Sequence, residues 1–291
     1  MNKNITLKRF INPKKGMRID TFLHSKLRDT SRSFIQYLIG SENIRVNGKG
    51  VKKNYILKGD EEITVNLIAD PATYIEAEEV PFDVLYEDPE FLIILKPSGI
   101  ITHPVGRQRR KTLLQGLLFK YPELKHWPGL GKPGLVHRLD RETSGIMIVA
   151  RNAAAQKNIM KQFEKRTVSK TYLAVVSGTV KNSGTVEAPI KRNEIRRTNF
   201  SVSPGGRYAK THFRAVKNFK NYSLLLIRPY TGRTHQIRVH LSHIGFPVAG
   251  DKKYGGDDAP RIMLHAYSIS FSHPASGKRV YFKTKFPKDF K

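Results

Sequence analysis

Apolar residues in the first quarter of the chain recur first at helical spacing and then in short strand-like runs. The run from Ile19 to Leu27 places apolar side chains three and four residues apart, as on the buried face of a helix. A second run of this kind follows Ser31, which is a suitable N-cap. Asn47-Gly48 is a turn signal next to a strand. The pattern predicts two helices and two strands, with helical core positions Ile19, Phe22, Leu23, Leu27, Phe34, Ile35, Leu38 and Ile39 and strands at 44–46 and 62–65.

From residue 81 onward, apolar runs of strand length outnumber helical ones. One helix is expected at 153–165, with Ile159, Met160 and Phe163 on its apolar face, and another ends at Gly245, a typical C-terminal stop. Because few long helices separate the strands, the pattern predicts an α+β domain with a mixed, largely antiparallel sheet and flanking helices. The expected strands are 84–86, 91–95, 146–150, 171–176, 208–217 and 222–228.

An acidic stretch separates these two regions. Between Asp60 and Glu90 the chain has 11 acidic residues and neither Lys nor Arg. Within it, residues 70–79 start with an Asp-Pro pair and have the composition of a linker. We therefore expect a small module over residues 1–75 and a larger domain over 76–291.

The charge of the chain points to a polyanionic partner. The 291 residues carry a formal net charge of +28, and all 52 Lys and Arg lie outside the acidic stretch. Self-repulsion of this size is tolerated where counter-charge is normally bound, although a solvated basic surface is the plain alternative. No apolar run approaches the roughly 18 residues that cross a bilayer, and the basic N-terminus lacks a signal-peptide core. We expect RNA or DNA as partner, in the cytoplasm, and no membrane.

The sequence offers little for metal or thiol chemistry. It contains no cysteine, so neither a thiolate nucleophile nor a thiolate ligand is available. His235, His240 and His243 lack the i, i+4 pair with an acidic partner that a zinc helix uses, and the next acid along the chain is Asp251. We expect no metal site.

Asp140 is the leading candidate for chemistry. It stands between Arg138 and Arg141, directly before a Thr-Ser-Gly turn. An aspartate there can simply form or cap the turn, but a plain turn does not need the Val-His-Arg-Leu sequence before it. A carboxylate kept ionised by a nearby cation can attack the anomeric carbon of a sugar or a base ring. Arg233 or Arg238, near the start of the second expected helix, could supply that cation, although arginines at such places often bind only phosphate or solvent.

Lys170 and Tyr172 share one face of an expected strand, since they are two residues apart. A tyrosine in a strand is more often a core residue. A phenol beside a lysine also suits stacking on a base or acid–base work, so both readings stay open.

Three stretches of the chain, residues 137–145, 170–178 and 231–255, resemble RNA pseudouridine synthases of the ribosomal large-subunit (RluA-like) family. Weaker support comes from residues 85–88, 96–99 and 263–266. The resemblance covers about residues 81–286. It implies an enzyme whose catalytic domain has a central cleft and isomerises uridine in RNA to pseudouridine.

The resemblance also implies roles for single residues. Asp140 would be the nucleophile, Arg238 its partner, and Tyr172 a platform for the uracil that also moves a proton. Arg138 would fill the space left when the base leaves its stack, and Leu264 would pack beside the base. Because the uracil is only detached, turned and rejoined through C5, no metal or other cofactor is expected. Further substrate-binding residues expected on the same grounds are His137, Lys170 and Arg233.

Residues 17–68 resemble the small RNA-binding module of the ribosomal protein S4 type, which many members of this family carry. Where that module usually has a glycine two positions before its strand, this chain has Glu42, with Gly40 two residues earlier. The resemblance implies that the module binds RNA. The residues expected to contact it are Ser31, Arg32, Arg45 and Asn47.

Two other functions remain open at this level. A non-catalytic RNA-binding or ribosome-assembly protein would use the same basic surface without needing Asp140, Tyr172 and Arg238 together. A metal-dependent nuclease would need paired carboxylates at ligand spacing, which the sequence lacks. For the synthase, the expected substrate is large-subunit (23S-type) ribosomal RNA, with tRNA as the alternative, and the expected state is a monomer.

Overall fold

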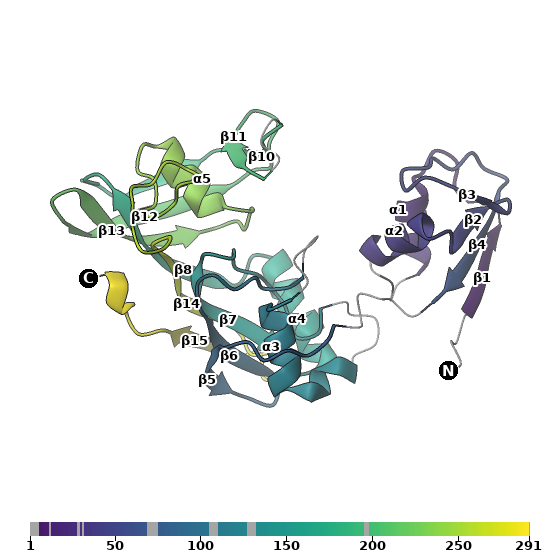
Figure 1. The fold of residues 1–291 in the computed structure, drawn as a ribbon, viewed down its shortest axis with the longest axis horizontal. Helices are drawn as coiled ribbons and strands as arrows, with labels where there is room; N and C mark the ends of the chain where they lie inside the picture. Colours follow the sequence, from purple (N-terminus) through teal and green to yellow (C-terminus); the bar gives the residue numbers. More distant parts are fainter. Residues whose placement is uncertain are drawn as a thin grey trace. The chain divides into compact units, whose positions relative to one another are not determined.

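The computed structural model describes residues 6–11, 13–27, 30, 32–68, 75–104, 110–126, 132–194 and 198–290. The chain divides into two compact units (Figure 1). Unit 1 comprises Met1–Glu76 with Lys125–Pro133, and unit 2 comprises Ala77–Leu124 with Gly134–Lys291. The boundary expected at residue 75 stays a prediction, since residues 69–74 lie outside the described ranges.

Unit 1 combines two helices with a four-stranded antiparallel sheet of order β1-β4-β2-β3. The helices and strands share one apolar core, in which Ile19, Leu23, Ile35 and Ile63 are fully buried. The elements are α1 (Ile19–Lys26), α2 (Arg32–Gly40), β1 (Thr6–Ile11), β2 (Ile44–Val46), β3 (Lys49–Gly50) and β4 (Glu62–Leu67). Both predicted helices and both predicted strands of this region are therefore confirmed. Ser31, the expected N-cap, lies outside the described residues.

The turn between α2 and β2 keeps a glycine-like backbone without a glycine. Glu42 has φ of 55°, in the left-handed region. The Asn43 amide donates to the Leu38 carbonyl across the turn at 2.9 Å. A left-handed conformation costs a non-glycine residue about 1–2 kcal/mol. Glu42 thus carries the strain that a glycine would avoid.

A buried carboxylate links the two helices of unit 1. The Asp20 side chain is fully buried and accepts hydrogen bonds from Arg18 at 3.0 Å and from Gln36 at 2.7 Å. Arg32 donates to the same carboxylate from α2 at 3.0 Å. Burial raises the pKa of Asp20, but the hydrogen bonds from Arg18, Gln36 and Arg32 outweigh it and hold the pKa well below its usual range. Arg32, expected to contact RNA, therefore also stabilises the module.

We expect Asp20→Ala to destabilise unit 1 by about 1.5–3 kcal/mol, the range for hydrogen bonds to a charged group. The pKa of Asp20 is depressed in the folded state, so its contribution is fully present above the unfolded pKa of about 3.9. It is lost as the pH falls toward the lower folded pKa. Urea unfolding followed between pH 7 and pH 3 measures this. Glu62→Gln, which removes a half-exposed carboxylate 3.7 Å from Arg9, is the control, and an equal loss there would contradict the role of Asp20.

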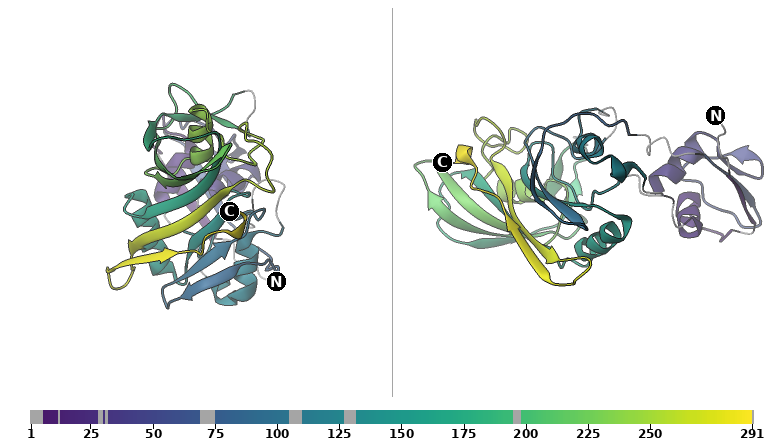
Figure 2. Two further views of the ribbon diagram at one scale, coloured as in Figure 1. Left: turned by 90° about the vertical axis from the view of Figure 1, so that its left-hand side faces the viewer. Right: turned by 90° about the horizontal axis from the view of Figure 1, so that it is seen from below.

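Unit 2 is built on a nine-stranded sheet of order β5-β6-β7-β14-β8-β13-β12-β9, with β15 paired to β14. Only β7 and β14 pair in parallel, and the other pairs are antiparallel. Figure 2 shows the sheet from two further sides. The strands are β5 (Asp83–Glu87), β6 (Phe91–Lys96), β7 (Ser144–Ala150), β8 (Ser169–Ser177), β9 (Gly184–Glu187), β12 (Lys210–Asn218), β13 (Tyr222–Pro229), β14 (Leu264–Ser272) and β15 (Arg279–Lys283). The fold is α+β, as predicted.

Helices and one small hairpin flank this sheet. The hairpin is formed by β10 (Ile190–Arg192) and β11 (Phe200–Val202). The helices are α3 (Leu113–Lys120), α4 (Ala153–Glu164) and α5 (Gln236–His243), with short 3-10 turns at Pro122–His126 and Lys288–Phe290. α4 contacts β7 and β14, whereas α5 contacts β11, β12 and β13. Within the described ranges, no helix is long and apolar enough to cross a membrane.

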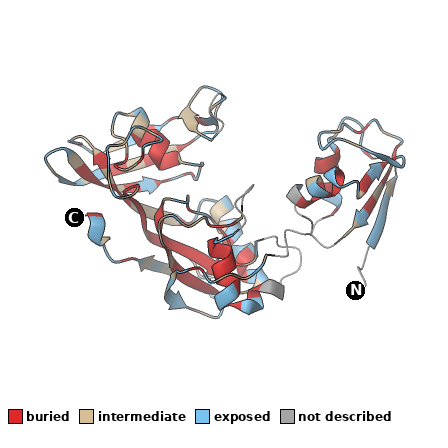
Figure 3. Cartoon of the chain, viewed as in Figure 1, coloured by how far each residue is buried: buried red, intermediate tan, exposed pale blue. Residues whose placement is uncertain are grey.

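The middle of the sheet of unit 2 is deeply buried. All seven residues of β7 are buried (Figure 3). A strand covered on both faces reads as a continuous apolar run rather than an alternating one. The far half of the sheet packs its own core against α5, through residues such as Leu225, Ile227 and Leu241. These two packed halves hold the segments that carry the candidate site.

One predicted core position in unit 2 is wrong. Met160 was expected on the buried face of its helix but is 46% exposed. The face of α4 that turns inward carries Ala155, Gln156 and Ile159 instead. The helix itself and the hairpin of β12 and β13 are confirmed. The elements α3, β9, β14 and β15 were not predicted.

Candidate active site

Asp140 lies on a short loop before β7 that is tied to the segment after β6. The Leu139 carbonyl accepts from the Thr102 hydroxyl at 2.9 Å, and the Glu142 carbonyl accepts from the Ser98 hydroxyl at 2.6 Å. The amide of Gly99 donates to the Arg141 carbonyl at 2.8 Å. These hydrogen bonds fix the main chain on both sides of Asp140. They position the Asp140 side chain, which takes no part in them.

A buried lysine completes this attachment. Lys96 is fully buried, and its ammonium group donates to the carbonyls of Pro97 and Ile100 at 2.8 Å and to that of Arg141 at 3.1 Å. Burial lowers the pKa of Lys96 to about 8, and the charges of Asp140 and Glu142 oppose that shift. Lys96 is therefore a second cation near Asp140, one that sequence reasoning missed.

Gly145 fixes where the loop enters the sheet. It pairs in parallel with Ala266 of β14 and has φ of 127°. A Cβ at this position would collide with the backbone nitrogen and oxygen of Ala266. Only glycine allows β7 to approach β14 this closely, so the glycine of the Thr-Ser-Gly turn is required by packing.

α5 brings Arg238 to the same place. The helix starts after His235, whose backbone is left-handed with φ of 55°. The Gln236 side chain holds this start: its carbonyl oxygen accepts from the Thr231 hydroxyl at 2.7 Å and from the Arg233 amide at 2.9 Å. The arginine at 238 is buried, with 3% of its side chain exposed.

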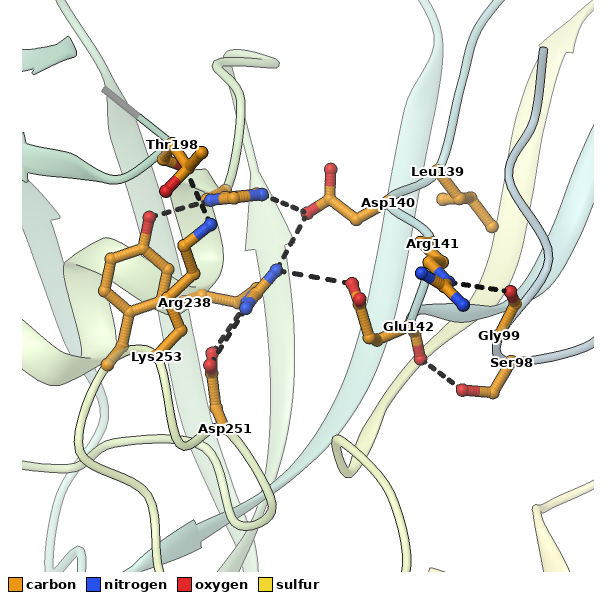
Figure 4. Close-up of polar contacts among 12 residues, drawn as sticks. Ser98, Gly99, Leu139, Asp140, Arg141, Glu142, Thr198, Arg238, Asp251 and Lys253 are labelled. Carbon is orange, nitrogen blue, oxygen red and sulfur yellow. Dashed lines mark hydrogen bonds and ion pairs between the residues drawn. The ribbon is translucent and has the colours of Figure 1, made fainter. Parts of the chain in front are cut away.

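Arg238 faces three carboxylates (Figure 4). Its closest partner is Asp251, which accepts from Nε at 2.6 Å and from Nη2 at 2.9 Å. Nη1 lies 3.7 Å from Oδ2 of Asp140 and 3.9 Å from the carboxylate of Glu142. The pairing of Arg238 with Asp140 therefore takes the form of a longer contact, while the bidentate pair is made with Asp251.

The charge state of Asp140 reflects this arrangement. Burial raises the pKa of Asp140, and the charges of Arg238, Arg138 and Lys96 offset only part of the increase. Asp251 neutralises the nearest cation and itself raises the pKa of Asp140. The carboxylate is thus held in place without a close hydrogen-bonded cation, which leaves it more basic than an ordinary aspartate.

A pocket of about 480 Å³ opens beside Asp140. Its walls come from the 136–143 loop, the end of α4, β8, the start of α5 and the first residue of β14. The structure brings all the catalytic and substrate-binding candidates of unit 2 together here. They are Asp140, Tyr172, Arg238, Arg138, His137, Lys170, Arg233 and Leu264.

Within this pocket, Tyr172 and Lys170 project from β8. Burial raises the pKa of the Tyr172 phenol, and the charge of Asp140 adds to the increase. Burial lowers the pKa of Lys170, whose ammonium group lies 5.8 Å from the centre of the Phe163 ring. The pocket therefore offers a neutral phenol and a cation that releases a proton more readily than usual.

His137 is fixed against the protein. Its ring stacks on Phe163 with centroids 4.7 Å apart, and its Nε2 accepts from the Ile148 amide at 2.9 Å. Burial, with a smaller contribution from Lys170, lowers the pKa of His137 to about 3. Its ring is neutral, and this geometry gives it a supporting place in the pocket wall.

The remaining candidates of this pocket differ in exposure. Arg138 is exposed, Leu264 is 3% exposed, and Arg233 donates from Nε to the Tyr208 carbonyl at 3.0 Å. A second hollow of about 840 Å³ also borders Asp140 and is lined by basic residues such as Arg192 and Lys252. Asp140, Arg138, His235 and Arg238 belong to the walls of both.

The candidate residues of unit 1 have different local roles. Arg45 is exposed and lies 3.4 Å from Glu42. Asn47 has φ of 48°, and its side-chain oxygen accepts from the Glu62 amide at 2.8 Å, so it shapes the turn after β2. Arg32 and Arg45 both have side chains that are about half exposed, and each also pairs with a carboxylate, Asp20 and Glu42 respectively.

Comparison with known proteins agrees with this fold. Residues 90–243 match the RNA pseudouridylate synthase family, and residues 17–63 match the S4 domain. The chain is 38% identical to "Uncharacterized RNA pseudouridine synthase YlyB" of Bacillus subtilis (strain 168), over 94% of this chain and 92% of that protein. It is 35% identical to "Ribosomal large subunit pseudouridine synthase D" of Escherichia coli (strain K12), over 94% and 88%.

A solved structure supports the same conclusion. The human protein "RNA Pseudouridylate Synthase Domain Containing 1" has a TM-score of 0.60 and 28% identity, and the match covers 71% of this chain and 84% of that one. An α+β domain with this profile, joined to an S4 domain, defines an RNA-modifying enzyme. The chain belongs to the RNA pseudouridylate synthase family.

Proposed function

We propose that this RNA pseudouridine synthase acts on large-subunit ribosomal RNA and uses Asp140 as the nucleophile on a flipped-out uridine. The observation that carries the proposal is the pocket of about 480 Å³, with Asp140, Tyr172 and Leu264 on its wall. Binding sites for small groups have volumes of about 300–1,000 Å³. A single extruded nucleoside is therefore a suitable occupant.

The chemistry needs only the carboxylate and proton transfers. Asp140 attacks C1′ of the ribose, and the N1–C1′ bond breaks with its electron pair on the uracil. The uracil turns so that C5 faces C1′, a C5–C1′ bond forms, and the carboxylate leaves. The proton on C5 is lost and N1 gains one, so the product is an isomer and neither water nor an oxidant is consumed.

The cations of the pocket suit this charge flow. Negative charge develops on the uracil as the glycosidic bond breaks. Lys170, Arg138 and Arg238 line the pocket, and fixed cations aimed at a developing charge stabilise a transition state most effectively in a dry site. The lowered pKa of Lys170 also makes it a suitable proton donor to the detached base.

Base flipping follows from access to the ribose carbon. Asp140 cannot reach C1′ while the uridine is stacked in a helix, so the nucleotide has to be extruded. Tyr172 provides an aromatic platform for the extruded base, worth about 1–3 kcal/mol. Arg138 is exposed and lines both hollows beside Asp140. We expect it to occupy the position that the base leaves.

The proposed substrate rests on the relatives and on the module. The relatives from Escherichia coli and Haemophilus influenzae are named ribosomal large subunit pseudouridine synthase D, and the latter is 34% identical over 98% of this chain. We extend that substrate to this chain, acting in the cytoplasm as a monomer. Mapping pseudouridines in ribosomal RNA and tRNA from cells with and without the gene tests it. Loss of sites in 23S-type RNA supports the proposal, and loss confined to tRNA contradicts it.

The S4 domain is expected to supply part of the RNA affinity. Arg45→Gln should lower the slope of log K against log salt by about one, the value for one lost phosphate contact. Filter binding of an rRNA fragment at several salt concentrations measures this slope. Lys181→Gln removes an exposed charge outside the module and serves as the control. An equal change in both variants would show that the slope reports overall charge.

A further inference from the structure

The segment of residues 248–256, here called the buttress loop, folds tightly behind the site. The Asp251 amide donates to the Val248 carbonyl, and the amides of Tyr254 and Gly256 donate to the Asp251 carbonyl, each at 3.0 Å. Gly250 and Gly256 lie so close to other backbone that a Cβ on either would collide with it. The loop therefore holds the side chains that it projects in fixed positions.

Two of these side chains reach the groups around Asp140. Asp251 is fully buried and binds Arg238 through both carboxylate oxygens, at 2.6 and 2.9 Å. The Tyr254 hydroxyl lies 2.7 Å from Nδ1 of His235, and the Arg238 guanidinium lies 5.1 Å from the centre of the Tyr254 ring. One loop thus contacts both Arg238 and His235.

Arg238 and His235 approach the same oxygen of Asp140. Nη1 of Arg238 lies 3.7 Å from Oδ2, and Nε2 of His235 lies 4.0 Å from Oδ2. In Figure 4 the other oxygen of Asp140 carries no dashed line. Both contacts are longer than a hydrogen bond and both are made to Oδ2, which leaves Oδ1 for the reacting carbon.

The partners of Tyr254 favour one tautomer of His235. The Phe200 amide donates to the Tyr254 oxygen at 3.0 Å, so the hydroxyl hydrogen is available to Nδ1 of His235, 2.7 Å away. Burial, with smaller contributions from Arg238 and Lys253, lowers the pKa of His235 to about 3, so the ring is neutral. A neutral imidazole that accepts at Nδ1 carries its hydrogen on Nε2, where it faces Asp140.

We propose that Asp251 and Tyr254 are positioning residues, which hold Arg238 and the Nε2–H of His235 against Oδ2 of Asp140 so that Oδ1 attacks C1′. This inference rests on the proposed role of Asp140. It gives the buttress loop a function in the reaction, although neither residue lines the 480 Å³ pocket. Their effect passes through the carboxylate, so losing them should slow the chemical step and leave RNA binding nearly unchanged.

Tyr254→Phe tests the histidine half, because it removes one oxygen and keeps the ring. Nitrogen-15 NMR of the histidine side chains, without RNA, should show the Nε2–H form of His235 in the wild type and its loss in the variant. The single-turnover rate should fall about 10- to 100-fold, the scale on which a small misplacement of a reacting group is felt. Tyr121→Phe, which removes a buried hydroxyl bonded to Glu87 at 2.7 Å, should change neither. A wild-type His235 with hydrogen on Nδ1, or an unchanged rate in Tyr254→Phe, would overturn this half.

A double-mutant cycle tests the arginine half. Asp251→Asn and Arg238→Lys should each lower the single-turnover rate, and together they should lower it little more than Arg238→Lys alone. A purely structural Asp251 would give multiplied effects and a raised RNA dissociation constant instead. If Asp251→Asn does not fold, Tyr254→Phe still decides the proposal. The NMR result does not depend on turnover, so failure of the proposed function, seen as no isomerisation by the wild type, is distinct from failure of this inference.

Discussion

Asp140→Asn is expected to abolish isomerisation while RNA affinity stays nearly unchanged. Asparagine keeps the shape of the side chain but cannot form the bond to C1′. Loss of a nucleophile lowers kcat by about 10⁴- to 10⁶-fold in well-studied enzymes. Tritium released from C5-labelled uridine in an rRNA transcript measures the rate, and filter binding measures the affinity.

Glu142→Gln is the matched control for this change. Glu142 lies two residues away, is about half exposed and also faces Arg238, at 3.9 Å. Its variant removes the same charge from the same loop, so it should keep most of the activity. Turnover of Asp140→Asn at the level of this control would contradict the nucleophile assignment. A loss of folding stability confined to Asp140→Asn, seen by urea unfolding, would attribute the inactivity to structure.

Tyr172→Phe should lower the rate by about 10²- to 10⁴-fold, the usual contribution of a positioned proton-transfer group. The ring still stacks on the base, so RNA binding should be kept. In the free enzyme, burial and the charge of Asp140 raise the pKa of this phenol.

Deuterium at C5 of the uridine makes this test specific. A slowed C5 step should reveal an isotope effect in Tyr172→Phe that is larger than in the wild type. Tyr230→Phe, at an exposed tyrosine of the same pocket, should show neither the slow rate nor the isotope effect. A Tyr172→Phe rate within a few-fold of the wild type would limit Tyr172 to stacking.

The predictable parts of the fold are the helices and strands whose buried residues recur at regular spacing in the sequence. β7 is buried along its whole length, so it appears as an unbroken apolar run. α5 ends at His243 and is followed by Gly245, whose φ of 82° favours glycine. β1 was missed because it is an edge strand with mostly exposed side chains. α3 was missed although its buried leucines follow a capping box at Thr112, a signal that was available in the sequence.

The residues of the candidate site also differ in whether the sequence predicts them. Asp140, Tyr172 and Arg238 stand in distinctive local sequences, which made them candidates before their positions were known. Asp251 is the direct partner of Arg238, but 13 residues separate the two. It lies in the same distinctive stretch as Arg238, residues 231–255, but local spacing does not show that its side chain binds Arg238. Its burial and its geometry exist only in the folded chain, and the same holds for the contact between Tyr254 and His235.

The close pairing of β7 with β14, at Gly145 and Ala266, limits how the sequence of the enzyme can change in evolution. Asp140 lies five residues before Gly145, and Leu264 lies two residues before Ala266, the partner of Gly145. Main-chain pairing, rather than side-chain packing, therefore sets the spacing between Asp140 and Leu264. Evolution is free to exchange the exposed residues around the pocket, and with them the RNA that the proposed site accepts, while this spacing is kept.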